Sequence, residues 1–278
     1  MYVYIPVGAV IYRRTWDNSE TISFYSLGGT SSASTKVVVD KAGYVYAVRS
    51  DYVWKIAPTG SLVWQIPISL TAPYIAVSRL GTVFISSSGG VVYKITPNGD
   101  MSSALVTLGL TSGIAVGLNE ELYVVCNTKT ADIRGLWKIT DTEAVRLIDT
   151  RCWSVAVAKD TTLYVGTETY YDSNAYALRR FSNTGELLDE ISTTIIANSI
   201  VLDDMDNLYA YSNSSQQLIR ITSGRNGEWT RQFGSDYNEC RLAIDTEGAV
   251  YIASRGIVRD SLKYHRLMKV LPDNTFLW

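Results

Sequence analysis

Short apolar runs separated by turn residues recur along the whole chain, and the stretch Ile75–Met101 shows this pattern clearly. The stretch contains an apolar run, a turn at Gly81, a triplet centred on Phe84, a polar turn, the run Val91–Ile95 and a Pro-Asn-Gly turn. Short apolar runs that are bounded by Gly, Pro, Asn and Asp predict β-strands joined by tight turns. With a further apolar run around Ala104–Leu108, the stretch predicts one repeat of four antiparallel strands.

Three positions of this repeat recur along the chain. The first strand is an apolar run, which appears at Val37–Asp40, Ile75–Ser78, Ile114–Gly117, Val155–Ala158, Ile200–Asp203 and Leu242–Asp245. The second strand has a central aromatic residue, which is Tyr46, Phe84, Tyr123, Tyr164, Tyr209 or Tyr251. The third strand carries a basic residue, which is Lys55, Lys94, Lys138, Arg180, Arg220 or Lys269. Because every copy has this basic residue, we expect it to be structural, either pairing between repeats or covering apolar surface with its stem.

The N-terminal residues form a further, incomplete copy. Arg13 aligns with Lys94 and Tyr4 falls near the aromatic position, but 1–36 holds no counterpart of the first strand. The chain therefore divides into seven repeats, at about 1–36 (partial), 37–74, 75–113, 114–154, 155–199, 200–241 and 242–278. A period of about 40 residues (278/7) with four strands per repeat predicts a single all-β domain over 1–278, a seven-bladed β-propeller. Six blades with an N-terminal appendage are the alternative.

The repeat resembles those of a known group of propellers. Its apolar-Ala-Val-Asp run, Gly turn and aromatic triplet, followed by Lys or Arg, Ile, Pro and Gly, resemble the NHL and YVTN-type propeller repeats. It is also similar to repeats in uncharacterised propeller proteins of tailed-phage virions. The resemblance covers essentially the whole chain and implies the propeller fold, which hosts many unrelated functions. Gluconolactonase-type propellers use a Glu, Asn and Asp set around a metal, and no such set can be assigned in this sequence.

Three repeats have longer connections between their second and third strands, at Cys126–Gly135, Thr167–Tyr176 and Ser254–His265. In a propeller these connections share a face with the segments that enter each first strand, so we expect one elaborated face. Aromatic and Arg side chains on such a face suit recognition of a protein or a sugar. The candidate binding residues are Tyr74, Arg134, Arg151, Trp153, Tyr170, Tyr171, Tyr176, Arg241, Arg259 and Tyr264. The alternative is that the longer hairpins vary freely on a tolerant surface.

Candidate catalytic and metal-binding residues are sparse. His265 is the single histidine, and it makes neither a His-ligated metal site nor a recognisable Ser-His-Asp arrangement. The acidic cluster Asp203–Asn207 could bind Ca²⁺, but it occupies the first turn of its repeat, where Asp caps the turn. Cys126, Cys152 and Cys240 have no metal-ligand spacing and are expected to be buried thiols, unless the fold brings one pair together. We therefore predict no catalytic residue, no metal and no cofactor.

Charge and hydropathy indicate which partners and which cellular location to expect. Lys and Arg number 25 against 27 Asp and Glu, which gives a net charge of −2 and lacks the basic footprint of a nucleic-acid-binding protein. The positive charges near the N-terminus follow the apolar run instead of preceding it, which argues against a signal peptide, and no segment is long enough to span a membrane. We expect a cytoplasmic protein, or a virion protein if the phage resemblance holds.

These observations favour a non-enzymatic structural or interaction protein, a propeller scaffold that binds protein or glycan partners and is a candidate phage virion or tail component. One alternative is a lactonase- or lyase-type propeller enzyme that works in the central channel, and another is a cytoplasmic scaffolding propeller. The missing first strand of the N-terminal repeat adds a partner hypothesis, because an unpaired strand position is a template for strand addition. The ring must otherwise tolerate a thin blade or close by another pairing.

Overall fold

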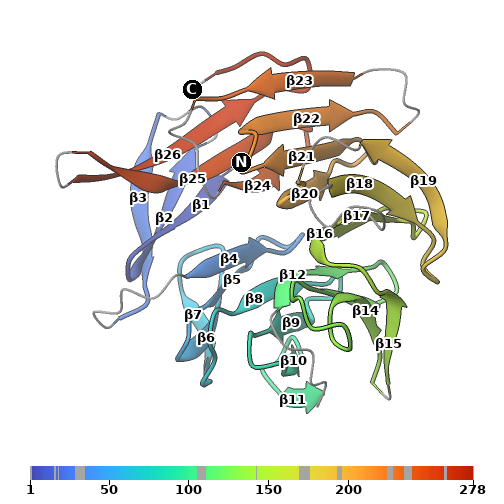
Figure 1. Cartoon of the computed structure of the whole chain (residues 1–278). Coiled ribbons are helices and arrows are strands. Elements are labelled where there is room, and N and C mark those ends of the chain that lie inside the picture. Colours follow the sequence, from blue (N-terminus) through green and yellow to red (C-terminus); the bar gives the residue numbers. More distant parts are fainter. Residues whose placement is uncertain are drawn as a thin grey trace. The chain divides into compact units, whose positions relative to one another are not determined.

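Among the residues that it describes, every regular element of the computed structural model is a β-strand. The structure describes residues 2–15, 17, 19–28, 35–104, 111–141, 143–168, 176–192, 196–223, 228–234, 240–259 and 262–277. The described strands form seven antiparallel sheets, one for each predicted repeat, and Figure 1 labels strands in chain order where there is room. The prediction of a seven-bladed all-β propeller is confirmed, and the six-blade alternative is not needed because the N-terminal strands form a sheet of their own.

Within each blade, the strands lie side by side in the order in which they occur along the chain. Blade 1 has three strands, β1 (Tyr2–Val7), β2 (Val10–Thr15) and β3 (Thr21–Ser26). Blade 2 consists of β4 (Lys36–Val39), β5 (Val45–Val48), β6 (Tyr52–Ile56) and β7 (Leu62–Pro67). Blade 3 consists of β8 (Tyr74–Val77), β9 (Val83–Ser86), β10 (Val92–Ile95) and β11 (Met101–Ala104). Blade 4 consists of β12 (Thr111–Val116), β13 (Leu122–Cys126), β14 (Gly135–Ile139) and β15 (Ala144–Ile148).

The remaining blades continue this order. Blade 5 consists of β16 (Cys152–Val157), β17 (Leu163–Glu168), β18 (Tyr176–Phe181) and β19 (Leu187–Ser192). Blade 6 consists of β20 (Ser199–Leu202), β21 (Leu208–Ser212), β22 (Gln217–Ile221) and β23 (Glu228–Gln232). Blade 7 has β24 (Arg241–Ile244), β25 (Val250–Arg259) and β26 (Leu262–Val270), and an isolated bridge joins Val270 to Phe276.

The chain divides into two compact units, and the division falls within blade 4. Unit 1 is Met1–Leu122 with Ile139–Ala144, and unit 2 is Tyr123–Lys138 with Val145–Trp278. Inside unit 1 the first strands of blades 2, 3 and 4 contact each other in sequence, and inside unit 2 those of blades 5, 6 and 7 do the same. Contact between successive first strands is how propeller blades pack around their inner edges.

The recurring aromatic and basic residues are cross-strand partners. The register pairs Tyr4 with Arg13, Tyr46 with Lys55, Phe84 with Lys94, Tyr164 with Arg180, Tyr209 with Arg220 and Tyr251 with Lys269. Directly opposed side chains in an antiparallel pair lie close enough to interact. The cation lies over the partner ring in several blades, at 5.5 Å for Lys55 over Tyr46 and 5.1 Å for Lys269 over Tyr251.

The basic residue also links blades, as the repeat pattern predicted. Lys55 Nζ donates to the carbonyl of Pro97 in the next blade at 2.9 Å, and Arg13 Nη1 reaches Pro58 O at 3.4 Å. Lys94 Nζ lies 2.8 Å from Asp141 Oδ1. Each contact joins the strand that carries the basic residue in one blade to the turn after the corresponding strand of the next blade, within unit 1. This recurring column is therefore structural and carries no candidate function.

The Asp of the first turn holds that turn closed. Asp40 Oδ1 accepts hydrogen bonds from the backbone N–H groups of Ala42 and Tyr44, both at 2.9 Å, and Oδ2 accepts one from the Tyr46 hydroxyl at 2.9 Å. Asp203 accepts from the N–H groups of Met205 and Asn207 in the same way. The capping interpretation of the acidic cluster is thus confirmed, since Asp203 serves its own turn.

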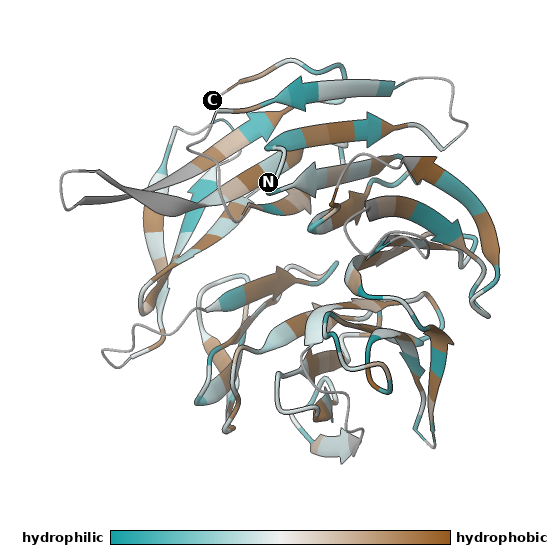
Figure 2. Cartoon of the chain, in the orientation of Figure 1, coloured by the Kyte–Doolittle hydropathy of each residue, from teal (hydrophilic) through white to brown (hydrophobic). Residues whose placement is uncertain are grey.

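Apolar side chains from facing sheets fill the space between blades. One buried cluster joins blades 2 and 3 in unit 1, with Tyr46, Val53, Ile75 and Ile85 among its members. A second joins blades 6 and 7 in unit 2. Figure 2 shows hydrophobic segments along the strands and more hydrophilic ones in many connections. In the described part of the chain no helix has the length and apolar character needed to cross a membrane.

Candidate functional site

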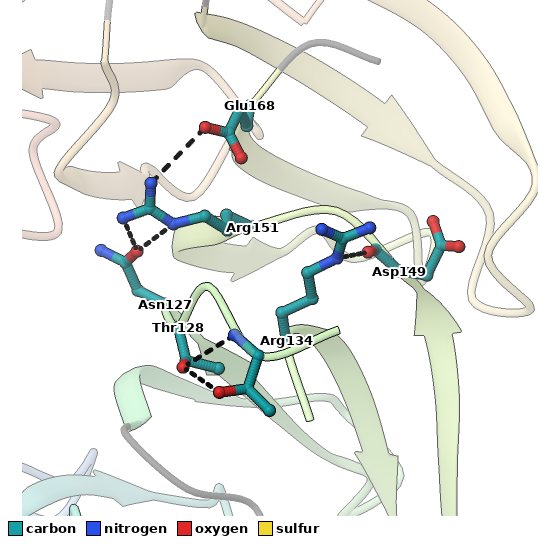
Figure 3. Close-up of polar contacts among 7 residues, drawn as sticks. Asn127, Thr128, Arg134, Asp149, Arg151 and Glu168 are labelled. Atoms are coloured by element: carbon teal, nitrogen blue, oxygen red, sulfur yellow. Dashed lines mark hydrogen bonds and ion pairs between the residues drawn. The ribbon is translucent and has the colours of Figure 1, made fainter. Parts of the chain in front are cut away.

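A polar cluster lies in unit 2, where the β13–β14 connection of blade 4 meets the ends of two strands of blade 5 (Figure 3). Asn127 directly follows β13, Arg151 directly precedes β16, and Glu168 is the last residue of β17. We call Asn127, Arg151 and Glu168 the Arg151 cluster. The antiparallel pairing of β16 with β17 places the start of one strand beside the end of the other, and Glu168 N donates to Arg151 O at 2.9 Å.

Arg151 is the centre of this cluster. Its Nε and Nη2 donate to Asn127 Oδ1 at 3.1 and 2.8 Å, and its Nη1 lies 3.5 Å from Glu168 Oε1. Its guanidinium carbon lies 5.2 Å from the centre of the Trp153 ring, within the range of a cation–π contact. Two amide contacts and one ring therefore fix the orientation of the guanidinium, while its contact with Glu168 is long for a charge-assisted hydrogen bond.

Glu168 is a nearly buried carboxylate, with a side chain that is 11% exposed. The strand behind it is held by Arg179 of β18, whose Nη1 donates to Glu168 O and Thr167 Oγ1, each at 3.2 Å. Arg179 itself pairs with Glu190 Oε2 at 2.7 Å. Because Arg179 engages the backbone of Glu168 and another carboxylate, the Glu168 side chain has Arg151 as its partner in the cluster.

Arg134, in the β13–β14 connection, contacts the segment between β15 and β16 that leads to Arg151. Its Nε donates to Asp149 O at 2.5 Å, as Figure 3 shows. The adjacent Gly135 has φ +122°, and a Cβ there would lie 1.8 Å from Ile148 O. Only glycine permits this approach of the backbone, so Gly135 sets where Arg134 lies just before β14.

A cavity of about 390 Å³ lies beside the cluster, between β15 and the strands β18 and β19. It is lined by Arg146, Leu147, Ile148, Asp149, Arg179, Phe181, Gly185 and Leu187. Asp149 connects it to Arg134, and Arg179 connects it to Glu168. Its volume is within the range of small-molecule sites, and its lining mixes apolar walls with charged groups.

The described side chains offer no metal site. Among them, no group of three or more His, Cys, Asp or Glu residues is arranged to hold a metal ion. Cys126, Cys152 and Cys240 are buried, as expected, and none of the three is in a disulfide. Burial raises the pKa of the Cys126 thiol to about 12 and raises that of Cys152 as well. Both therefore stay protonated at neutral pH and are poor nucleophiles.

The structure brings together only part of the predicted binding set. Arg134, Arg151 and Trp153 lie in or beside the Arg151 cluster. Tyr74 lies elsewhere, in β8, with Lys36 Nζ 5.7 Å from its ring centre, and Arg241 donates to Asn198 O at 3.2 Å.

The other predicted binding residues lie wholly or partly outside the described part of the structure. Tyr170 and Tyr171 are outside the described residues. Tyr176, Arg259 and Tyr264 lie on the backbone of β18, β25 and β26, and their side chains are outside what is described.

One expected loop is a pair of strands. The interpretation of Ser254–His265 as a long hairpin loop is wrong, because β25 runs to Arg259 and β26 starts at Leu262. After a bulge between Ser254 and Ile257, the inserted residues continue the antiparallel register up to Arg259 opposite Leu262. Backbone pairing across the insertion satisfies the groups that a loop would leave to water.

Sequence reasoning missed Asn127, Glu168 and Arg179. Asn127 and Arg151 are separated by 24 positions, and their contact depends on the packing of blade 4 against blade 5. The signal that could have pointed to Glu168 is its place at the end of the second-position strand. Among the described residues it is the only acidic one there, since the other repeats have Val7, Val48, Ser86, Cys126, Ser212 and Arg259.

Comparison with known proteins identifies the fold. No protein-family model and no curated protein matches the chain. Among solved structures, a virginiamycin B lyase from Staphylococcus aureus is 17% identical with a TM-score of 0.70, over 91% of this chain and 88% of that one. A streptogramin B lyase is 16% identical with a TM-score of 0.72, over 96% and 89%. A putative gluconolactonase is 15% identical with a TM-score of 0.54, over 75% and 77%.

These comparisons correct one expectation and leave two others without support. At such low identity they establish the propeller fold, yet the neighbours are named as lyases and as a putative lactonase. The expectation of a non-enzymatic protein is therefore wrong, because neighbours with this architecture are named as enzymes. The predicted likeness to phage virion proteins and the predicted glycan binding find no support among these neighbours.

Proposed function

We propose that this protein is a propeller enzyme of the lyase or lactonase type, with the Arg151 cluster as its reaction centre. The observation that carries the proposal is Glu168: a nearly buried carboxylate at the end of β17, 3.5 Å from a guanidinium that Asn127 and Trp153 hold in place. The likeness to lyase and lactonase structures favours this class. The proposal takes up the enzymatic alternative that the sequence left open and assigns its reaction to residues of unit 2.

The two reaction types need the same pair of groups. In an elimination, Glu168 removes a proton from the carbon next to a carbonyl, the electron pair of that C–H bond forms a C=C bond, the C–O bond on the neighbouring carbon breaks, and the departing oxygen takes up the proton. In lactone hydrolysis, Glu168 removes a proton from a water that adds to the carbonyl carbon, the ring C–O bond then breaks, and the departing oxygen takes up the proton from Glu168. Negative charge develops on the carbonyl oxygen in both cases, and Arg151 is placed to stabilise it. A positioned base typically contributes a factor of about 10²–10⁴ to the rate.

The geometry of the pair suits this role. A tight bidentate ion pair would occupy both carboxylate oxygens, whereas the 3.5 Å contact engages one of them weakly. The fixed Arg151 therefore leaves a carboxylate oxygen of Glu168 able to meet an incoming C–H or water. The proposed steps use the side chains of the Arg151 cluster.

The test uses virginiamycin B, a further streptogramin B compound and a gluconolactone as substrates, with products identified by mass spectrometry. An elimination that opens a ring gives a product with the mass of the substrate, and hydrolysis that opens a ring adds the mass of one water. Glu168→Gln should lower kcat about 10²-fold or more with little change in unfolding temperature. Arg151→Lys keeps the charge but loses the two contacts to Asn127, so it should lower kcat less than Arg151→Ala does.

Glu186→Gln is the matched control, because Glu186 is an exposed carboxylate in the β18–β19 turn of the same blade. It should leave kcat unchanged. If the wild-type chain turns over none of these compounds, the substrate class is wrong. If it turns one over and Glu168→Gln is as active as Glu186→Gln, the Arg151 cluster is not the reaction centre.

A further inference from the structure

The first blade has an open strand position. In the described part of the chain, β1 pairs with β2 and with no other strand, so blade 1 is a sheet of three. Tyr4 opposite Arg13 matches Tyr46 opposite Lys55, which places β1 at the second position of the blade. In blades 2 to 7 the other edge of that second strand carries a first strand. The edge is uncovered only in blade 1, among the residues that the structure describes.

The burial of β1 agrees with a missing neighbour. All residues of β5, β9, β13, β17 and β21 are buried, whereas β1 has no buried residue and is exposed at Tyr2 and Val7. Tyr2 is 47% and Val7 46% exposed. The same strand position is thus a core strand in five blades and a partly wetted edge in this one. Unpaired edges of this kind are templates for another chain.

The other blades show what fits the open position. The residue opposite the second-strand aromatic is always small or β-branched, and it is Val38, Ala76, Ala156, Val201 or Ala243 where the register is described. Its two neighbours along the strand are aliphatic in every case. A small residue is needed there because directly opposed Cβ atoms in an antiparallel pair lie only about 4.5–5.5 Å apart.

The backbone of β1 is oriented to receive such a strand. In blade 2, Asp40 N donates to Tyr44 O, so the backbone groups of Tyr44 and Tyr46 face the first strand. The equivalent residues Tyr2 and Tyr4 therefore direct theirs to the open edge, since backbone groups alternate sides along a strand. Pro6 is next in this alternation and has no N–H to offer, which limits non-specific pairing at that end.

We propose that blade 1 is completed by a strand donated by a partner protein, an extended segment with the pattern aliphatic–Ala/Val–aliphatic that pairs antiparallel with β1 and sets its small residue opposite Tyr4. The donor replaces the absent first strand, so its recognition combines backbone hydrogen bonds with the side-chain pattern of the chain's own first strands. This binding is independent of the Arg151 cluster, which belongs to unit 2.

The experiment adds a synthetic peptide with the sequence of residues 72–79, which contains the first strand of blade 3, to the full-length protein. Saturating peptide should raise the unfolding temperature by about 2–4 °C or more. It should also slow hydrogen exchange at the Tyr2 and Tyr4 amides. The control peptide carries Ala76→Glu, which puts a charge and a longer side chain opposite Tyr4, and it should have neither effect.

A protein variant gives an independent check. Pro6→Val restores one backbone donor on the open edge, so it should tighten binding of the matching peptide without affecting the control peptide. Equal effects of the two peptides, or no effect of either on the wild type and on Pro6→Val, would refute the proposal. Concentration-dependent dimerisation that protects Tyr2 and Tyr4 without peptide would refute it as well, since a second copy would then occupy the edge.

Discussion

Blade 7 contains a buried ion pair whose removal tests the account of the repeat. Asp245 Oδ2 lies 3.6 Å from Lys269 Nζ, and the two side chains are 4% and 2% exposed. Asp245 also accepts hydrogen bonds from Glu247 N at 3.0 Å, Ala249 N at 2.8 Å and the Tyr251 hydroxyl at 3.1 Å. One carboxylate thus holds the first turn, the recurring aromatic residue and the recurring basic residue of this blade.

The expected loss in the free energy of unfolding depends on which member of the ion pair is removed. Asp245→Ala removes three hydrogen bonds and leaves the buried Lys269 ammonium without this carboxylate, so it should lower the free energy of unfolding by ~3–5 kcal/mol. Lys269→Met leaves Asp245 with its three donors, and should cost only ~1–3 kcal/mol. The double variant removes both charges, and its cost should be smaller than the sum of the single costs by ~0.5–3 kcal/mol.

The matched control is the exposed pair of Lys94 and Asp141. Its atoms lie 2.8 Å apart, but the side chains are 37% and 79% exposed, so Asp141→Asn should cost ~0–1 kcal/mol. Urea unfolding followed by tryptophan fluorescence and by far-UV circular dichroism measures each value, and coincident curves show a single transition. The reasoning is refuted if Asp245→Ala costs no more than Asp141→Asn, or if the two single costs in blade 7 add.

Three further predictions concern backbone, charge and reactivity. Gly135→Ala should cost more than ~2 kcal/mol, because φ is +122° and the new Cβ would meet a carbonyl oxygen at 1.8 Å, whereas Gly234→Ala has open space and should be near neutral by the same urea assay. Arg49 hydrogen bonds lower the pKa of Asp51 below 3.8, so the pair adds stability above that pH and loses it as the pH falls through the lower folded-state value. Asp51→Asn should thus destabilise the protein near neutral pH and not in strong acid; an equal loss at both would contradict this. Burial raises the pKa of Cys126 to about 12, so iodoacetamide should label it in urea and not in the native protein, as peptide mass mapping can show.

The sequence by itself determined the repeat, the strand order within each blade and the incomplete N-terminal copy. These features are local: Tyr46 and Lys55 meet across a short hairpin, and Asp40 closes a turn of a few residues. Alternation, turn chemistry and period report such contacts directly, because strand neighbours in a meander are also sequence neighbours. The structural role of the basic residue followed from the same periodicity, and Lys55 reaching Pro97 confirms it.

Only the tertiary structure decided which polar residues meet. Arg151 contacts Asn127 because blades 4 and 5 pack together, and it contacts Glu168 because β16 pairs with β17. Such contacts join positions that share no local pattern, so periodicity cannot rank them above other Arg, Asn and Glu residues. The extension of β25 to Arg259 was hidden for a related reason: inserted residues look alike in sequence whether they loop out or pair, and the pairing energy of the whole hairpin makes that choice.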